Sequence, residues 1–233
     1  MPNFNDLNSR QQTGLGIAGL ALGAGVGVAA YLFAKYNPRG GPVGNRDVPE
    51  PSKRVDLNRY LGRWYEQYRY EAPFQKGMEA VSADYALKDD GTIRVDNQAR
   101  RGSVDGPFAE SVGKAKVVDS ETNAKLKVSF FGPFWGDYWV LDHCDDYRWS
   151  IVGEPSGRFL WILTRDRNPA PAMLAMLEGK VKDMGYDWSL IRRTKQPGGA
   201  LDVARDDGAQ REARDGGKTR DTAPAYPGLA SVS

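Results

Sequence analysis

The sequence predicts an all-β fold, an eight-stranded antiparallel up-and-down β-barrel with one C-terminal helix, plus a transmembrane helix near the N-terminus. Three observations support this prediction. Short segments of alternating polarity follow one another between turn residues, one helical pattern follows the last of them, and residues 14–34 carry no charged side chain. Eight antiparallel strands are the number at which a closed barrel can hold one small ligand.

The strand segments are joined by short turns, and this regular spacing is typical of a β-sandwich or a closed barrel. Asp90-Gly91 stands between two alternating segments, which is a good hairpin signal. Closure into a barrel would also remove exposed sheet edges. The expected strands are 64–70, 81–88, 92–100, 108–119, 124–131, 138–144, 148–155 and 159–165.

The period changes after Asn168-Pro169, where apolar residues recur at helical intervals. The pattern ends at Gly185, and its residues are Met173, Leu174, Met176, Leu177 and Val181. We therefore expect one amphipathic helix after the last barrel strand, with residues 190–196 able to add a final short strand.

The chain divides into a polar segment 1–13, an apolar segment 14–34, a Pro/Gly linker 35–54, a barrel domain 55–196 and a disordered tail 197–233. The segment from Gly14 to Ala34 is long enough to cross a bilayer and long for the core of a signal peptide, so we favour an uncleaved anchor over a cleaved signal. Its glycines at 19, 23 and 27 would share one helix face, which allows a homodimer.

Composition narrows the classes of function. The 32 Lys and Arg balance 30 Asp and Glu to a net charge of +2 without a basic stripe, which argues against nucleic acid. The single cysteine, Cys144, excludes an internal disulfide, and the single histidine, His143, argues against a multi-histidine metal site. As adjacent strand residues they point to opposite faces and cannot act on each other. We therefore expect no enzyme activity, no metal and no cofactor.

The segment LNRYLGRWYEQYRY (57–70) carries an aromatic alternation that could form a sheet core, line a ligand cavity or stack on bases. A period of two places Trp64, Glu66, Tyr68 and Tyr70 on one side of the strand. The opposite side would hold Tyr65, Gln67 and Arg69. Tyr68 and Tyr70 would then stand higher on an inner wall than Trp64.

Four stretches occur in a fixed order: LGRWYE, KVSFFGPFWGDYWVLD, DDYRWSIVGEP and FLWILTR. With them the domain 55–196 resembles the lipocalins, specifically the bacterial lipocalin group. The resemblance implies that Gly62, Trp64, Tyr147 and Arg165 form a structural motif. In it the arginine lies across the indole and closes the barrel floor, where a cation–π contact adds stability.

The resemblance also implies an internal calyx for a fatty acid or a lysophospholipid. Strand parity gives the candidate ligand-binding residues Tyr68, Tyr85, Phe131, Trp139 and Trp161. We expect Phe134 and Trp135 in a loop over 132–138. Their side chains would either contact a membrane or a partner, or pack against the barrel.

Three functions follow: a membrane-anchored carrier of a hydrophobic ligand, a non-binding scaffold acting through its membrane helix, and, less favoured, an enzyme on a lipophilic substrate. Bacterial lipocalins of this kind are usually anchored at the periplasmic side through a lipidated cysteine, which this sequence lacks at that place. Lys35, Arg39 and Arg46 follow the apolar segment and favour a cytoplasmic domain. Because this bias is small, we favour the periplasmic side of the cell envelope.

Overall fold

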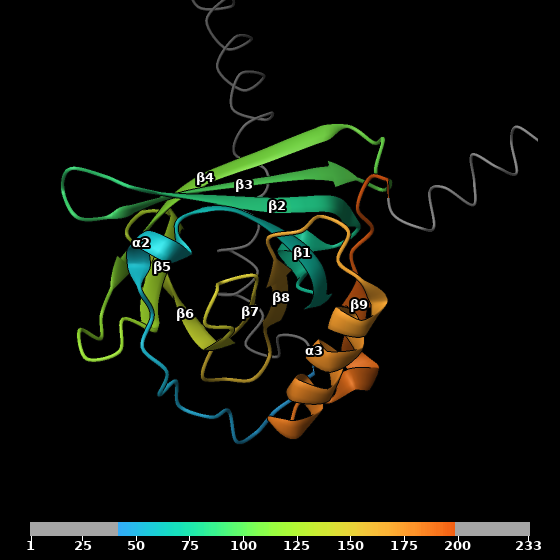
Figure 1. Cartoon of the computed structure of the whole chain (residues 1–233). Coiled ribbons are helices and arrows are strands. Elements are labelled where there is room, and N and C mark those ends of the chain that lie inside the picture. Colours follow the sequence, from blue (N-terminus) through green and yellow to red (C-terminus); the bar gives the residue numbers. More distant parts are fainter. Residues whose placement is uncertain (1–41, 199–233) are drawn as a thin grey trace, which may run out of the picture. The chain divides into compact units, whose positions relative to one another are not determined.

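The computed structural model describes residues 42–198, and within them eight strands close into one antiparallel barrel (Figure 1). Each strand pairs with the next from β2 to β8, and β1 pairs with both β8 and β2, which closes the sheet. This confirms the predicted barrel. The strands are β1 (Gly62–Tyr70), β2 (Met78–Leu87), β3 (Ile93–Arg101), β4 (Phe108–Val117), β5 (Lys125–Phe131), β6 (Phe134–His143), β7 (Trp149–Gly153) and β8 (Leu160–Thr164).

Two short helical turns mark the ends of the barrel. Helix α2 (Leu57–Tyr60) precedes β1, and the carboxylate of Asp56 accepts from the amides of its first turn. The 3-10 turn η1 (Pro73–Gln75) joins β1 to β2 at the opposite end. The antiparallel order therefore places the β1–β2, β3–β4, β5–β6 and β7–β8 connections at one end and α2 at the other.

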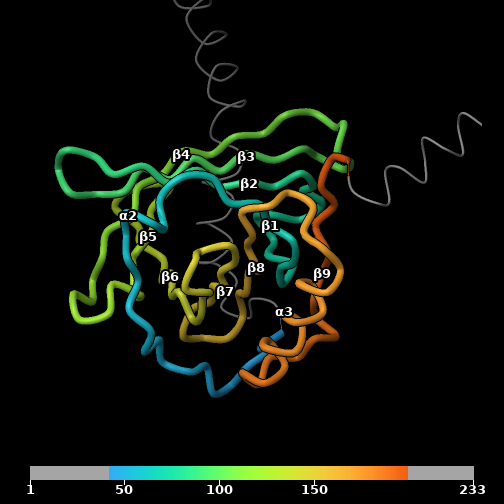
Figure 2. Tube along the Cα trace, in the orientation of Figure 1, coloured from blue at the N-terminus to red at the C-terminus, as the bar shows by residue number. Residues whose placement is uncertain are grey.

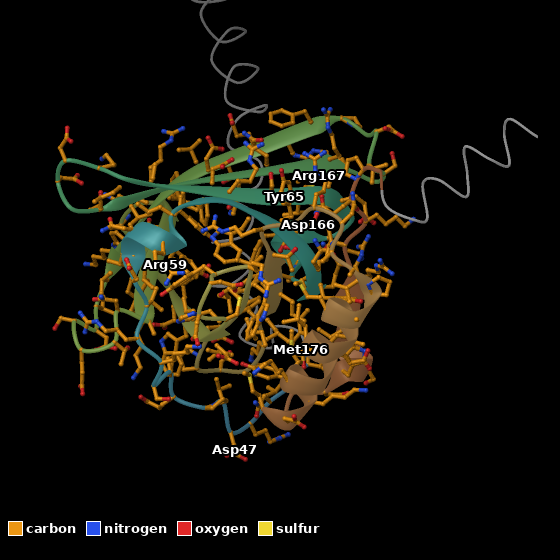
Figure 3. All side chains as sticks on the ribbon, viewed as in Figure 1. Asp47, Arg59, Tyr65, Asp166, Arg167 and Met176 are labelled. Atoms are coloured by element: carbon orange, nitrogen blue, oxygen red, sulfur yellow. The ribbon has the colours of Figure 1, made fainter. Side chains whose placement is uncertain are left out.

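Helix α3 (Pro171–Asp183) confirms the predicted C-terminal helix and packs outside the barrel. Leu174, Leu177 and Val181 are its buried side chains, and Leu177 and Val181 join an apolar cluster with the outer faces of β6, β7 and β8. Met176 points away into solvent (Figure 3). The helix lies beside β8 and β9 and leaves β3 and β4 uncovered (Figure 1).

A ninth strand, β9 (Ile191–Arg193), forms where a final short strand was expected, after the 3-10 turn η2 (Trp188–Leu190). β9 pairs with residues 68–70 of β1, toward the open end, while β2 pairs with residues 62–65. Both β1 and β2 shift register there, between Glu66 and Tyr68 and between Glu79 and Ser82. β9 and the residues after it therefore fill the seam that opens between two bulged strands.

Residues 42–54, part of the predicted Pro/Gly linker 35–54, run along the barrel from α3 to α2 (Figure 2). The amides of Gly44 and Asn45 donate to the carbonyl of Gly157 (2.9 and 3.3 Å). Asn45 is buried and donates to the carbonyl of Met184 (2.9 Å), and Val48 packs on the outer apolar cluster. Proline and glycine here belong to an extended segment that packs on the barrel.

The apolar segment 14–34 and the tail from 199 onward lie outside the described residues, so the predictions made for them stay predictions. Over residues 42–198, no helix has the length and apolar character that a membrane crossing requires.

Candidate ligand cavity

The barrel encloses a cavity of about 770 Å³. Its walls come from α2 and the barrel strands, and most side chains on them are apolar. The apolar side chains on its lining include Val95, Ala115, Leu126, Val128, Val140 and Leu163. This size lies within the range of natural small-molecule pockets, so the interior can hold a ligand and is not filled by its own side chains.

The floor is closed by Trp64 and Arg165. Trp64 is fully buried, and the Arg165 guanidinium lies over its ring at 3.9 Å from the centroid. The same guanidinium donates to the carbonyls of residues 59, 60, 61 and 63, with distances of 2.7 to 3.1 Å. It thereby satisfies carbonyls at the end of α2 that have no intrahelical partner.

Gly62 and Tyr147 occupy backbone conformations that the floor requires. Gly62 has φ +87°, and a Cβ added there would meet Nη1 of Arg165 at 3.4 Å. Tyr147 has φ +57°, stacks on His143 (4.5 Å) and accepts a hydrogen bond from the amide of Asp56 (2.7 Å). These contacts hold the segment before α2 onto the β6–β7 turn.

Four hydroxyl groups form a chain near the floor. Tyr60 contacts Ser150 (2.9 Å) and Tyr138 (3.0 Å), and Tyr138 contacts Tyr85 (3.1 Å). Burial raises the pKa of Tyr60 to about 12 and raises the pKa of Tyr85 and Tyr138 as well. These tyrosines line the cavity as neutral groups, so the hydroxyl chain gives the lining near the floor polar but uncharged groups.

The seam between β1 and β2 holds a buried ion pair. Arg69 is fully buried and donates to Glu66 (2.7 Å), whose carboxylate also accepts from Thr194 and from Gln75. Arg69 further donates to Glu71 (3.0 Å) and to two backbone carbonyls of the β1–β2 connection. Every terminal nitrogen of this guanidinium is thus engaged with the protein, while Glu66 lines the cavity.

Gln75 connects this pair to the cavity wall. Its amide nitrogen donates to Glu66 and its amide oxygen accepts from the indole of Trp161 (3.0 Å). Since Gln75 belongs to η1 at the open end, these bonds fix the β1–β2 connection beside the mouth.

The structure places Tyr85, Phe131 and Trp161 on the cavity lining. The inner-wall positions expected for Tyr68 and Trp139 are wrong, because both pack with the outer apolar cluster, Tyr68 against Trp188 at 5.2 Å. The bulge after Glu66 reverses the alternation of β1. Arg69 therefore turns into the seam, and Tyr68 and Tyr70 turn toward α3.

Trp139 was misplaced for a different reason. α3 and residues 42–54 cover the outer face of β6 to β8, so both faces of these strands are apolar and alternation carries little information. Its neighbours Tyr138 and Val140 face the cavity. Tyr65 illustrates the uncovered outer surface, where Arg167 lies over its ring at 4.9 Å (Figure 3).

Sequence reasoning missed Tyr60, Tyr138 and Gln75 as cavity residues. Tyr60 precedes the strand on a four-residue helix, and Gln75 sits in a turn, so strand parity could select neither. Tyr138 could have been found, because it alternates with Val140 on the same strand. β6 also begins earlier than expected, at Phe134, so Phe134 and Trp135 lie on a strand and not in a loop.

His143 and Cys144 lie outside the cavity lining. His143 is buried, and its ring nitrogens face the carbonyls of Cys144 (2.9 Å) and Arg54 (3.2 Å). The Cys144 sulfur accepts from the amides of Arg148 (3.0 Å) and Trp149 (3.2 Å), and burial raises its pKa. Over the described residues no group of His, Cys, Asp and Glu is arranged to hold a metal ion.

A closed antiparallel barrel with a plugged floor, an apolar cavity and one helix on its outer wall defines a ligand-binding calyx. The comparisons then give its family. The model of the lipocalin-like domain matches residues 55–196, and the chain belongs to the lipocalin family.

Two curated relatives show which lipocalins it is similar to. Outer membrane lipoprotein Blc of Escherichia coli K12 is 37% identical over 174 residues, covering 73% of this chain and 93% of that protein. Temperature-induced lipocalin-1 of Arabidopsis thaliana is 37% identical over 159 residues, covering 63% and 82%. The predicted kinship with bacterial lipocalins is confirmed, and the domain is a lipocalin-type binder of small hydrophobic ligands.

Among solved structures, insecticyanin from the tobacco hornworm is similar, with a TM-score of 0.54 and 19% identity, covering 69% of this chain and 93% of that one. At this identity the likeness shows the fold alone.

Proposed function

We propose that this protein binds and carries a lysophospholipid, in preference to a free fatty acid, at the cell envelope. The observation that carries the proposal is the charge of the cavity. Among the described residues that line it, the charged side chains are all carboxylates, and no Lys, Arg or His contributes to the lining. They belong to Glu66, Glu110, Asp137 and Glu154. The alternation of β4 and β6 turns the side chains of Glu110 and Asp137 outward, so Glu66 and Glu154 are the carboxylates that face the interior.

The apolar walls suit a single acyl chain. Each buried methylene contributes about 0.8 kcal/mol, so tail burial supplies most of the affinity before ordering costs. The polar side chains would then discriminate between head groups.

A fatty acid would bring a second carboxylate near Glu66 and Glu154 without a cation to receive it. Arg69, which lies beside Glu66, is already engaged with it (2.7 Å), and Lys127 holds Asp137 on the outer face (2.7 Å). Glu154 accepts from Ser156 and from the amides of residues 158 and 159. Such carboxylates attract the ammonium group of a zwitterionic head. They repel the carboxylate of a fatty acid, because the two charges have the same sign.

The remaining assignments extend this proposal. The segment Gly14–Ala34 would anchor the chain in a membrane, its glycine-rich face would pair two copies, and the barrel would stand on the periplasmic side. The name of the Blc relative, an outer membrane lipoprotein, supports a place at the envelope. A barrel filled by its own side chains would favour the scaffold alternative. The open cavity therefore supports the carrier.

Titration of tryptophan fluorescence tests the proposal, because all six tryptophans lie between residues 64 and 188. Residues 42–198, once shown to unfold cooperatively, would be titrated with lysophosphatidylethanolamine and with the fatty acid of the same chain length. We expect saturation at one lysophospholipid per chain and weaker binding of the fatty acid, which its uncharged methyl ester would recover.

Two tryptophans provide a matched pair of variants. Trp161→Ala, on the lining, should weaken binding, whereas Trp139→Ala, on the outer wall, should leave it unchanged. Tighter binding of the fatty acid than of the lysophospholipid would refute the head-group argument, and binding of neither would refute the carrier itself.

A further inference from the structure

Three exposed phenylalanines lie on the connections at the open end of the barrel. Phe108 begins β4 and is 54% exposed, Phe131 ends β5 and is 48% exposed, and Phe134 begins β6 and is 36% exposed. The rings of Phe131 and Phe134 stack across the Gly132–Pro133 turn, with 6.4 Å between their centroids. The β3–β4 connection carries Phe108 and the β5–β6 connection carries Phe131 and Phe134, and both connections lie at the mouth. These three side chains are here called the phenylalanine rim.

The phenylalanine rim is continuous with the cavity. Phe131, Pro133 and Phe134 also line the cavity, so one apolar surface leads from solvent to its interior. Phe108 is exposed but lies outside the lining, so ligand enclosure does not account for it.

Cations flank the phenylalanine rim. The Arg100 guanidinium lies over the Phe108 ring at 5.4 Å, and Arg101 and Lys76 are exposed at this end of β3 and in the β1–β2 connection. The connections that carry them are held together, since the amide of Gly102 donates to the carbonyl of Gly77 (2.8 Å). Over residues 100–110 the carboxylates are Asp105 and Glu110, both exposed, so the surplus of cations comes from Lys76 and from the lysines of β4.

A second basic pair lies on the outer face below the rim. Lys114 and Lys116 on β4 both stand over the Trp135 ring, at 5.5 and 4.7 Å. Exposed phenyl rings at an edge, an indole just below them and lysine and arginine around them are the side chains that favour a membrane–water interface. Each such cation near an anionic lipid surface adds attraction that salt screens.

From these contacts we infer that the mouth of the barrel docks on the surface of a bilayer containing anionic lipid, with the phenylalanine rim inserted among the head groups. The cavity then opens onto the membrane, and a single-chain lipid passes between them without crossing water. This inference goes beyond ligand binding, and the phenylalanine that tests it, Phe108, is not a cavity residue.

The test uses residues 42–198, once shown to unfold cooperatively, because segment 14–34 could itself insert into vesicles. It asks which end of the barrel meets lipid. An environment-sensitive fluorophore would be attached at Ser103→Cys, at the mouth, or at Ser120→Cys, at the closed end, in a Cys144→Ser background; both serines are exposed. Vesicles of phosphatidylcholine and phosphatidylglycerol would be added. We expect a blue shift at position 103, quenched by brominated lipid chains, and none at position 120.

Matched variants separate the phenylalanine rim from the rest of the surface. Phe108→Ser should lower the vesicle affinity reported at position 103 about tenfold, whereas Val118→Ser, 51% exposed at the closed end, should not. Arg100→Gln with Arg101→Gln should weaken docking on anionic vesicles and not on pure phosphatidylcholine.

Three outcomes would overturn the inference: equal responses at both labels, no response at position 103, or a response at 103 that follows protein concentration without vesicles and so indicates a second copy on this face. Lysophospholipid titration with the same labelled proteins keeps the two proposals apart. Ligand binding without docking would leave the carrier function standing and the docking surface refuted.

Discussion

Replacing Arg69 with methionine is the sharpest test of the seam between β1 and β2. The Arg69 side chain is fully buried and that of Glu66 is 3% exposed, so solvent does not screen their ion pair. Methionine keeps the volume of the aliphatic stem but removes the charge and all the donors. Glu66 then stays buried with Thr194 and Gln75 as partners and without a counter-charge.

Removing one partner of such a buried pair costs about 3–5 kcal/mol, out of a typical total of roughly 5–15 kcal/mol. Two backbone carbonyls also lose their donor, which places the expected loss toward the upper part of that range. Glu71 suffers less, because it is partly exposed and keeps Arg192. We expect Arg69→Met to lower the free energy of unfolding by roughly 4 kcal/mol.

Urea unfolding followed by tryptophan fluorescence and circular dichroism measures this loss. Arg63→Met is the matched control, because the Arg63–Asp84 pair is 47% and 33% exposed and should cost less than about 1 kcal/mol. Adding Glu66→Gln to Arg69→Met should restore part of the stability by removing the unpaired carboxylate. The reasoning fails if Arg69→Met costs no more than Arg63→Met, or if Glu66→Gln restores nothing.

Three further predictions concern the floor and the helix. Arg165→Lys should lower stability by about 2 kcal/mol in urea unfolding, because a single ammonium cannot cover Trp64 and also satisfy the carbonyls around α2; an unchanged midpoint would contradict this. Burial raises the pKa of Tyr60 to about 12, so the stability that its neutral hydroxyl contributes is complete below pH 10 and is lost as the pH rises to 12. The free energy of unfolding, measured at each pH, should fall by about 2–3 kcal/mol over this range, and by less in Tyr60→Phe. Gly62→Ala should destabilise by roughly 1–2 kcal/mol because of its positive φ, whereas Gly179→Ala, with open space at the added Cβ in α3, should stabilise by about 0.5–1 kcal/mol; calorimetric melting of both would show whether the signs differ.

The sequence by itself determined the barrel, the helix and the family. Alternation needs only near neighbours along the chain, and turn signals such as Asp90-Gly91 act locally, so strand number and order follow without knowledge of packing. The motif residues Gly62, Trp64 and Arg165 were placed by their resemblance to lipocalins. Their contacts at the floor then came from the structure.

The tertiary structure alone decided which side chains face the cavity and what charge they bring. The bulge after Glu66 occurs where β1 stops pairing with β2 and begins pairing with β9. It exchanges the sides of the strand on which Tyr68 and Arg69 lie. Trp139 faces outward because α3 and the segment before α2 cover that wall. These contacts join residues far apart in sequence, and strand periodicity does not encode them.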